Sequence, residues 1–191
     1  MISYSRRIEI ESAVVELLED YRFCSYPISI EAVLKALKVD FIPFKSLSDR
    51  EQALVNTASN DKALTVASHD YMRAQVICDV SISSYFLRHR FSGGHECGHL
   101  WLEHTENDPN REEEANYFSG YLLVPHPILL SSPKLITAND VSIAFGVSTD
   151  CAAIALRQAN LRKWRDKPLL PHERWLIEHI ELTGDGSIAH T

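Results

Sequence analysis

HECGHLWLEH, residues 95 to 104, holds three histidines and two glutamates in ten positions. Within it, His95, Glu96 and His99 match the pattern H-E-x-x-H. On a helix, the two histidines of this pattern stand one turn apart on the same face, so that both imidazoles can bind one cation. The intervening glutamate can then take a proton from a water molecule held by that cation. Whether the pattern performs this chemistry depends first on whether these residues are helical.

The spacing around the motif predicts a helix that begins near residue 85. Phe91, His95, His99 and Leu102 recur at intervals of three and four, and no proline follows until residue 109. We therefore expect His95 and His99 to be metal ligands. Glu96, beside them, is expected to act as the general base.

Two histidines need at least one further protein ligand to complete a catalytic zinc site. His104 lies five residues beyond His99, which on a continued helix is about 140° around the axis, and this argues against ligation. Its expected role is a cation near the helix C-terminus. The better candidates are the successive glutamates 112 to 114 in the first turn of a helix predicted over residues 110–125. Acidic residues also favour a helix N-terminus without any metal, so more than one reading is open for each.

Helix geometry favours Glu112 among the three glutamates. Ala115 and Phe118 mark the face expected to pack against the motif helix, and Glu112 is in line with that face. Glu114 shares a stripe with Phe118 and remains a competitor. Asn116, one turn after Glu112, is expected to hydrogen-bond its carboxylate, since ligating groups usually need such support.

Composition excludes several other classes of protein. The chain has 191 residues, is 45% hydrophobic and carries a net charge of -7, which gives no electrostatic footprint for nucleic acid. Its four cysteines, at positions 24, 78, 97 and 151, form no C-x-x-C pair, so neither a disulfide framework nor a cysteine zinc site is expected. Cys97 is expected to pack in the core. No apolar run is long enough for a membrane span, and we expect a cytoplasmic protein.

The elements before the motif predict an α+β fold with a small sheet. Apolar periodicity and caps indicate a helix over about residues 5–21, a second helix capped by Ser29, an edge strand at 39–44 and strands starting at 63 and 74. A polar turn around His69 and Asp70 joins the last two strands.

The segment after Pro125 has the pattern of a helix-turn-helix. Thr137 can cap a helix over residues 138–145, Gly146 can turn the chain, and Ser148 or Thr149 can cap a second helix running to about Gln158. The second helix offers few cations for phosphate, so packing or partner docking is favoured over DNA binding.

Four blocks of sequence resemble the ImmA/IrrE metallopeptidase family. RHRFSGGHECGHLWLEH is similar to the family's R-x-R-F-x-x-x-H-E-x-G-H, and EEEANYFSGYLLVP contains E-x-x-A-N-x-F and L-L-x-P. PISIEAVLKALKVDF and VSIAFGVSTDCAAIAL look like the family's opening segment and its later helix-turn-helix-like stretch. Gly93, Gly94, Cys97 and Ala155 depart from the residues usual in the family.

This resemblance implies a zincin-like fold, in which a small sheet packs on helices carrying H-E-x-x-H and a distal glutamate. It selects Glu112 as that glutamate, and it gives His95 and His99 the role of ligands and Glu96 the role of base. It further implies a peptidase that cuts helix-turn-helix repressors, often encoded in phages, mobile elements or stress-response regulons.

We therefore predict a zincin-like metallopeptidase domain over residues 1–128 and a helical, helix-turn-helix-like region with a tail over 129–191. The predicted function is a zinc-dependent endopeptidase of regulatory type, with a helix-turn-helix repressor as substrate. Mn²⁺ can occupy the same ligands. The alternatives are a regulator that binds metal and docks a repressor without cutting it, or a DNA-binding module. The oligomeric state is not predicted.

Overall fold

The computed structural model describes residues 2–43, 46–58, 63–67, 74–78, 86–104, 108–165 and 167–183. Helices predominate in these segments and two small sheets accompany them, which is an α+β structure. The chain forms two compact units, one of Ser29–Ser119 and the other of Met1–Ile28 with Gly120–Thr191. None of the described helices combines the length and the apolar character that crossing a lipid bilayer requires.

The sheet of the first unit has three strands in the order β2 (Asp40–Pro43), β4 (Ala74–Cys78) and β3 (Ala63–Ala67). β3 and β4 are antiparallel, whereas β2 runs parallel to β4. The prediction that the strand with Pro43 lies at an edge is confirmed, and an edge is where a residue without an N–H is tolerated. The predicted turn at His69 and Asp70 lies outside the described residues.

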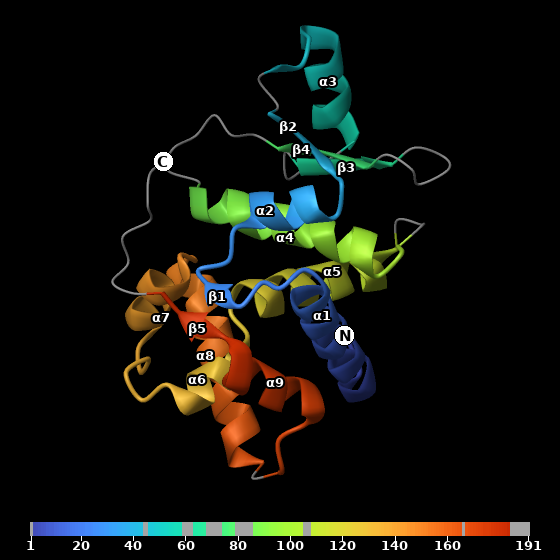
Figure 1. Cartoon of the computed structure of the whole chain (residues 1–191). Coiled ribbons are helices and arrows are strands. Elements are labelled where there is room, and N and C mark those ends of the chain that lie inside the picture. The colour runs from blue at the N-terminus through green and yellow to red at the C-terminus, as the bar shows by residue number, and fades with distance from the viewer. Residues whose placement is uncertain are drawn as a thin grey trace. The chain divides into compact units, whose positions relative to one another are not determined.

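The described residues of this unit also form the helices α2 (Ile30–Ala36), α3 (Asp49–Ala58), α4 (Phe86–Trp101) and the start of α5 (Pro109–Leu123). α4, which carries the H-E-x-x-H motif, packs against β3 and β4, and α3 contacts β3 (Figure 1). The predicted helical state of the motif is confirmed, as is the Ser29 cap of α2, whose hydroxyl accepts from the Ala32 amide at 3.2 Å.

α3 was not predicted from the sequence. Its residues give little signal of a buried face, and Leu54 in its middle is 63% exposed. Its start is fixed locally: the carboxylate of Glu51 accepts hydrogen bonds from the amide and the hydroxyl of Ser48, at 2.8 and 2.6 Å. The start of such a helix is therefore determined by its N-terminal cap more than by a hydrophobic pattern in its sequence.

Where the structure describes it, the second unit is helical apart from a parallel pairing of β1 (Ser25–Tyr26) with β5 (Glu181–Leu182). Its helices, besides the end of α5, are α1 (Tyr4–Asp20), α6 (His126–Ser131), α7 (Ala138–Phe145), α8 (Thr149–Trp164) and α9 (Pro171–His179). Tyr26 lies in its core, where the hydroxyl donates to the Leu122 carbonyl at 2.9 Å and the ring meets Phe145 edge-on.

The caps predicted for α7 and α8 are confirmed. Thr137 and Asp140 form a reciprocal capping box, and Ser148 caps α8 by accepting from the Cys151 amide. Gly146 ends α7 in the left-handed region, at φ 59°, which glycine adopts without steric cost. α8 continues to Trp164, well beyond the predicted end near Gln158.

The longer α8 ends with a buried ion pair. Arg162 donates to both carboxylate oxygens of Glu173 in α9, at 2.6 and 2.7 Å, and the Glu173 side chain is 1% exposed. Burial by itself raises the pKa of Glu173, but the hydrogen bonds from Arg162 and from the Leu170 amide, together with the Arg162 charge, outweigh it and hold the pKa below its usual value. Folding therefore favours the ionised carboxylate.

Glu173→Gln should lower the free energy of unfolding by about 2 kcal/mol near neutral pH, because charge-assisted hydrogen bonds are lost. A carboxylate whose pKa is lowered on folding stabilises above its unfolded pKa, and this contribution is lost as the pH falls through the folded value. The difference from wild type should therefore shrink in acid. Denaturant unfolding near pH 7 and near pH 3 measures it. Glu178→Gln, exposed on the same helix, is the control. A difference that persists undiminished in acid would contradict this account.

The sequence predicts a domain boundary after residue 128. The two compact units group residues by their contacts, which does not test where separate domains begin and end. The boundary stays a prediction.

Candidate metal centre

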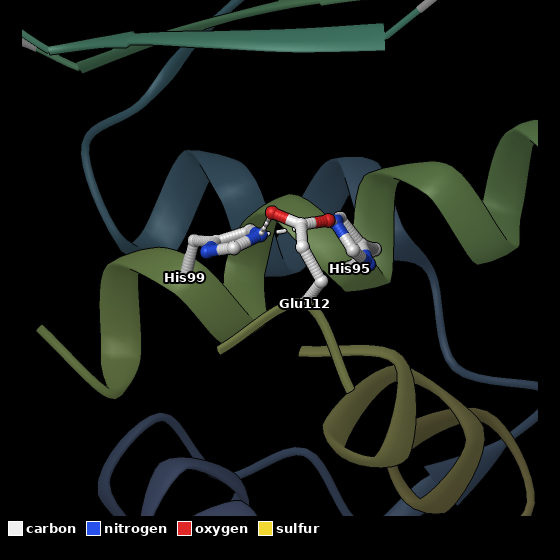
Figure 2. A group of neighbouring side chains, drawn as sticks. All are labelled: His95, His99 and Glu112. Atoms are coloured by element: carbon white, nitrogen blue, oxygen red, sulfur yellow. Dashed lines mark hydrogen bonds and ion pairs between the residues drawn. The ribbon is translucent and has the colours of Figure 1, made fainter. Parts of the chain in front are cut away.

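His95 and His99 point from α4 toward a common position, and Glu112 in the first turn of α5 points to the same place (Figure 2). The Nε2 atoms of the two imidazoles lie 3.0 Å apart. The Glu112 carboxylate places one oxygen 3.3 Å from His95 Nε2 and the other 3.3 Å from His99 Nε2. All three residues belong to the unit Ser29–Ser119. The predicted set of three side chains is thus brought together.

These distances fit a bound zinc ion. Ligand atoms about 2.0–2.1 Å from a tetrahedral Zn²⁺ lie about 3.3–3.4 Å from one another. Two nitrogens and one carboxylate oxygen also match the His, His, Glu donor set of hydrolytic zinc sites, which leave a fourth position for water. The imidazole side chains are each 17% exposed and that of Glu112 is 44% exposed, so the centre is accessible from solvent.

The protonation of His99 also suits a ligand. Burial, and then the neighbouring imidazoles of His95 and His104, lower the pKa of His99 to about 4. Its ring is therefore neutral at physiological pH and keeps a lone pair for a cation.

Asn116 orients the other ligand. Its side-chain oxygen lies 3.0 Å from His95 Nδ1. An amide oxygen can only accept, so His95 Nδ1 carries the hydrogen and Nε2 presents its lone pair toward Glu112. The predicted partner of Asn116 was the carboxylate of Glu112, and this was wrong. The residue is a supporting group as expected, but it supports the imidazole across from it on α4 instead of the carboxylate on its own helix.

Glycines allow α4 to approach its neighbours closely. A Cβ on Gly93 would lie 2.7 Å from a methyl group of Ile30 in α2, and a Cβ on Gly94 would lie 2.6 Å from the hydroxyl of Ser119. That hydroxyl donates to the Phe91 carbonyl at 2.7 Å. A side chain at either position would therefore require Ile30 or Ser119 to shift.

Gly98 sits where α4 meets α5. A Cβ there would lie 3.1 Å from both Ala115 Cα and Phe118 Cβ, so Gly98→Ala must push the two helices apart. Overpacking of this kind costs about 1–3 kcal/mol, which exceeds the gain of about 0.5–1 kcal/mol from replacing a helical glycine. We expect lower stability and weaker metal binding, measured by thermal unfolding and by metal titration.

Gly120→Ala provides the matched control, because a Cβ at Gly120 in the same α5 meets no atom within 4 Å. It should stabilise the protein slightly and leave metal affinity unchanged. Equal effects of the two alanines would show that close helix packing at Gly98 does not position the centre.

Glu96 and Cys97 follow His95 on α4. Glu96 is 7% exposed and Cys97 is fully buried. Burial, and then the charge of Glu96, raise the pKa of the Cys97 thiol, which leaves it protonated and unsuited to bind metal. The prediction that Cys97 packs in the core is confirmed. The role of Glu96 as base stays a prediction.

Sequence reasoning missed the contacts of His104. This residue is not in the ligand set, but its Nδ1 lies 3.1 Å from His99 Nδ1 and its Nε2 lies 3.2 Å from Glu114. Glu114, a competing ligand candidate in the sequence, therefore pairs with His104. The third histidine of HECGHLWLEH was the available signal. It was set aside because a continued helix would place His104 about 140° around the axis from His99.

Comparison with known proteins agrees with this chemistry. Residues 81–157 match the family model described as IrrE N-terminal-like domain, of peptidase family M78, and this range includes the whole ligand set. No curated protein and no solved structure matches the chain. The matched family is a family of metallopeptidases, which suggests a bound metal ion without identifying it. Residues 81–157 are thus similar to an IrrE N-terminal-like domain, and this similarity supports the assignment to the ImmA/IrrE family that the motifs predict.

Proposed function

We propose that this protein is a zinc-dependent endopeptidase whose ion is held by His95, His99 and Glu112. The observation that carries the proposal is the convergence of two imidazole nitrogens, 3.0 Å apart, with the carboxylate of Glu112, whose two oxygens each lie 3.3 Å from one of them. The helix pair with H-E-x-x-H and a distal glutamate, beside a small sheet, corresponds to a zincin-like arrangement. Mn²⁺ is the alternative ion for the same donors.

Zinc supplies a Lewis acid and a water molecule that ionises near neutral pH. The chain supplies the proton transfers. Glu96 takes the proton of the attacking water on a carboxylate oxygen, and it can deliver that proton to the leaving amine nitrogen. Asn116 accepts from His95 Nδ1, which leaves Nε2 on the side of Glu112 free to bind a metal ion.

The proposed substrate is a helix-turn-helix repressor, as the family resemblance implies. The second unit offers a helix-turn-helix-like pair, α7 and α8, as a docking element. The outer face of α8 exposes Ile154, Leu161 and Trp164, the last at 85%. Such apolar side chains suit contact with another protein better than contact with phosphate.

The test is to incubate the purified protein with purified helix-turn-helix repressors encoded beside its gene, with added Zn²⁺ and with a chelator. Metal-dependent cleavage at a defined bond, detected by mass spectrometry, is the expected result. Stable complex formation without cleavage in the presence of metal would favour the regulator that docks without cutting. Salt-sensitive, sub-micromolar binding to duplex DNA would instead favour the DNA-binding module.

A further inference from the structure

The His104 side chain lies beside the ligand His99 because α4 ends before residue 104. The helix stops at Trp101, and Glu103 adopts φ 54° in the left-handed region. The His104 amide then donates to the His99 carbonyl at 2.9 Å, which is the closing bond of a Schellman-type helix end. Residue 104 is thus folded back over His99, whereas a continued helix would carry it about 140° away.

The side chains continue this contact outward from the ligand. His104 Nδ1 lies 3.1 Å from His99 Nδ1, and His104 Nε2 lies 3.2 Å from a carboxylate oxygen of Glu114. The His104 side chain is 5% exposed and that of Glu114 is 17% exposed. The three groups form a row from the ion position to the carboxylate, largely shielded from water.

When both imidazole rings are neutral, the hydrogen bonds along this row can have only one donor-to-acceptor order. An ionised Glu114 can only accept, so His104 Nε2 donates to it. His104 Nδ1 then has a lone pair and must accept, which requires the hydrogen of His99 to be on Nδ1. His99 Nε2 is left unprotonated, and it is this atom that faces Glu112 at 3.3 Å.

We propose that His104 and Glu114 are positioning residues, which fix the tautomer and ring orientation of His99 for metal binding. The inference rests on the proposed metal centre and deepens it. Asn116 does the same for His95 with a neutral oxygen, whereas His99 is supported through a second imidazole that ends on a carboxylate. Supporting groups of this kind typically contribute about 10–100-fold in metal affinity.

Metal affinity measured by chelator competition tests the inference. His104→Ala and Glu114→Ala should each weaken Zn²⁺ binding by about 10–100-fold, and the double mutant should lose less than the product of the single effects, because the two act through one row. His104→Gln should restore much of the affinity, since its amide offers one acceptor and one donor. Glu113→Ala, adjacent on α5 and exposed, is the matched control and should bind like wild type.

A second readout separates positioning from general destabilisation. Thermal unfolding of the metal-free proteins should show His104→Gln and Glu114→Ala folded at the temperature of the titration, and the absorption spectrum of the Co²⁺-loaded protein should change in His104→Ala but not in Glu113→Ala. Wild-type affinity and an unchanged Co²⁺ spectrum in both alanine variants would overturn the inference while leaving the proposed function intact. If wild type itself binds no metal, the proposed function fails and this inference fails with it.

Discussion

Glu96→Gln is expected to keep its metal and to lose peptide cleavage by several orders of magnitude, on the order of 10²–10⁴-fold. Glutamine has nearly the shape of glutamate but cannot take up the proton of the attacking water. Glu96 is 7% exposed on α4 and is not among the converging ligand atoms, so the change should disturb the centre little. Metal content by elemental analysis and cleavage rate at saturating Zn²⁺ measure the two halves of the prediction.

Glu113→Gln is the control for this experiment. Glu113 is an exposed carboxylate on α5 outside the ligand set, and its loss should change neither metal content nor rate. If Glu96→Gln cleaves the repressor at close to the native rate, Glu96 is not the base. If it loses the metal as well, its role is in holding the centre.

Glu112→Ala is expected to weaken metal affinity by tens-fold or more. This loss should exceed the loss caused by Glu113→Ala or Glu114→Ala. Glu112 is the carboxylate that reaches both imidazoles, whereas Glu114 contacts His104. Chelator competition on the three single alanine variants should therefore rank Glu112 first, Glu114 second and Glu113 close to wild type. A larger loss at Glu113 or Glu114 would show that the wrong carboxylate has been assigned.

The ligand set could be predicted from sequence because each step rests on helical periodicity. Four residues separate His95 from His99, and α4 is helical throughout that interval, so the two imidazoles share a face. Glu112 follows Pro109 in the first turn of α5, in line with the buried Ala115 and the fully buried Phe118. Where the helix is regular, spacing alone places the side chain.

The supporting residues could not be predicted in the same way, since they depend on where helices end and on which helix faces which. His104 contacts His99 because the chain turns at Glu103, a non-glycine residue in the left-handed region that no local pattern reveals. Asn116 reaches His95 across the helix pair, and the sequence contains no signal for that pairing. The close approach of α4 to α5 at Gly98, where an added Cβ would lie 3.1 Å from Ala115 and Phe118, is likewise seen only in the packed structure.

The metal content of the purified protein tests the central claim most directly. Elemental analysis of wild type should find about one metal ion per chain, and the His95→Ala, His99→Ala double mutant, prepared in parallel and shown to be folded by circular dichroism, should contain almost none. A stoichiometric metal that is undiminished in the double mutant would contradict the account, because the ion would then be bound somewhere other than the centre formed by His95, His99 and Glu112.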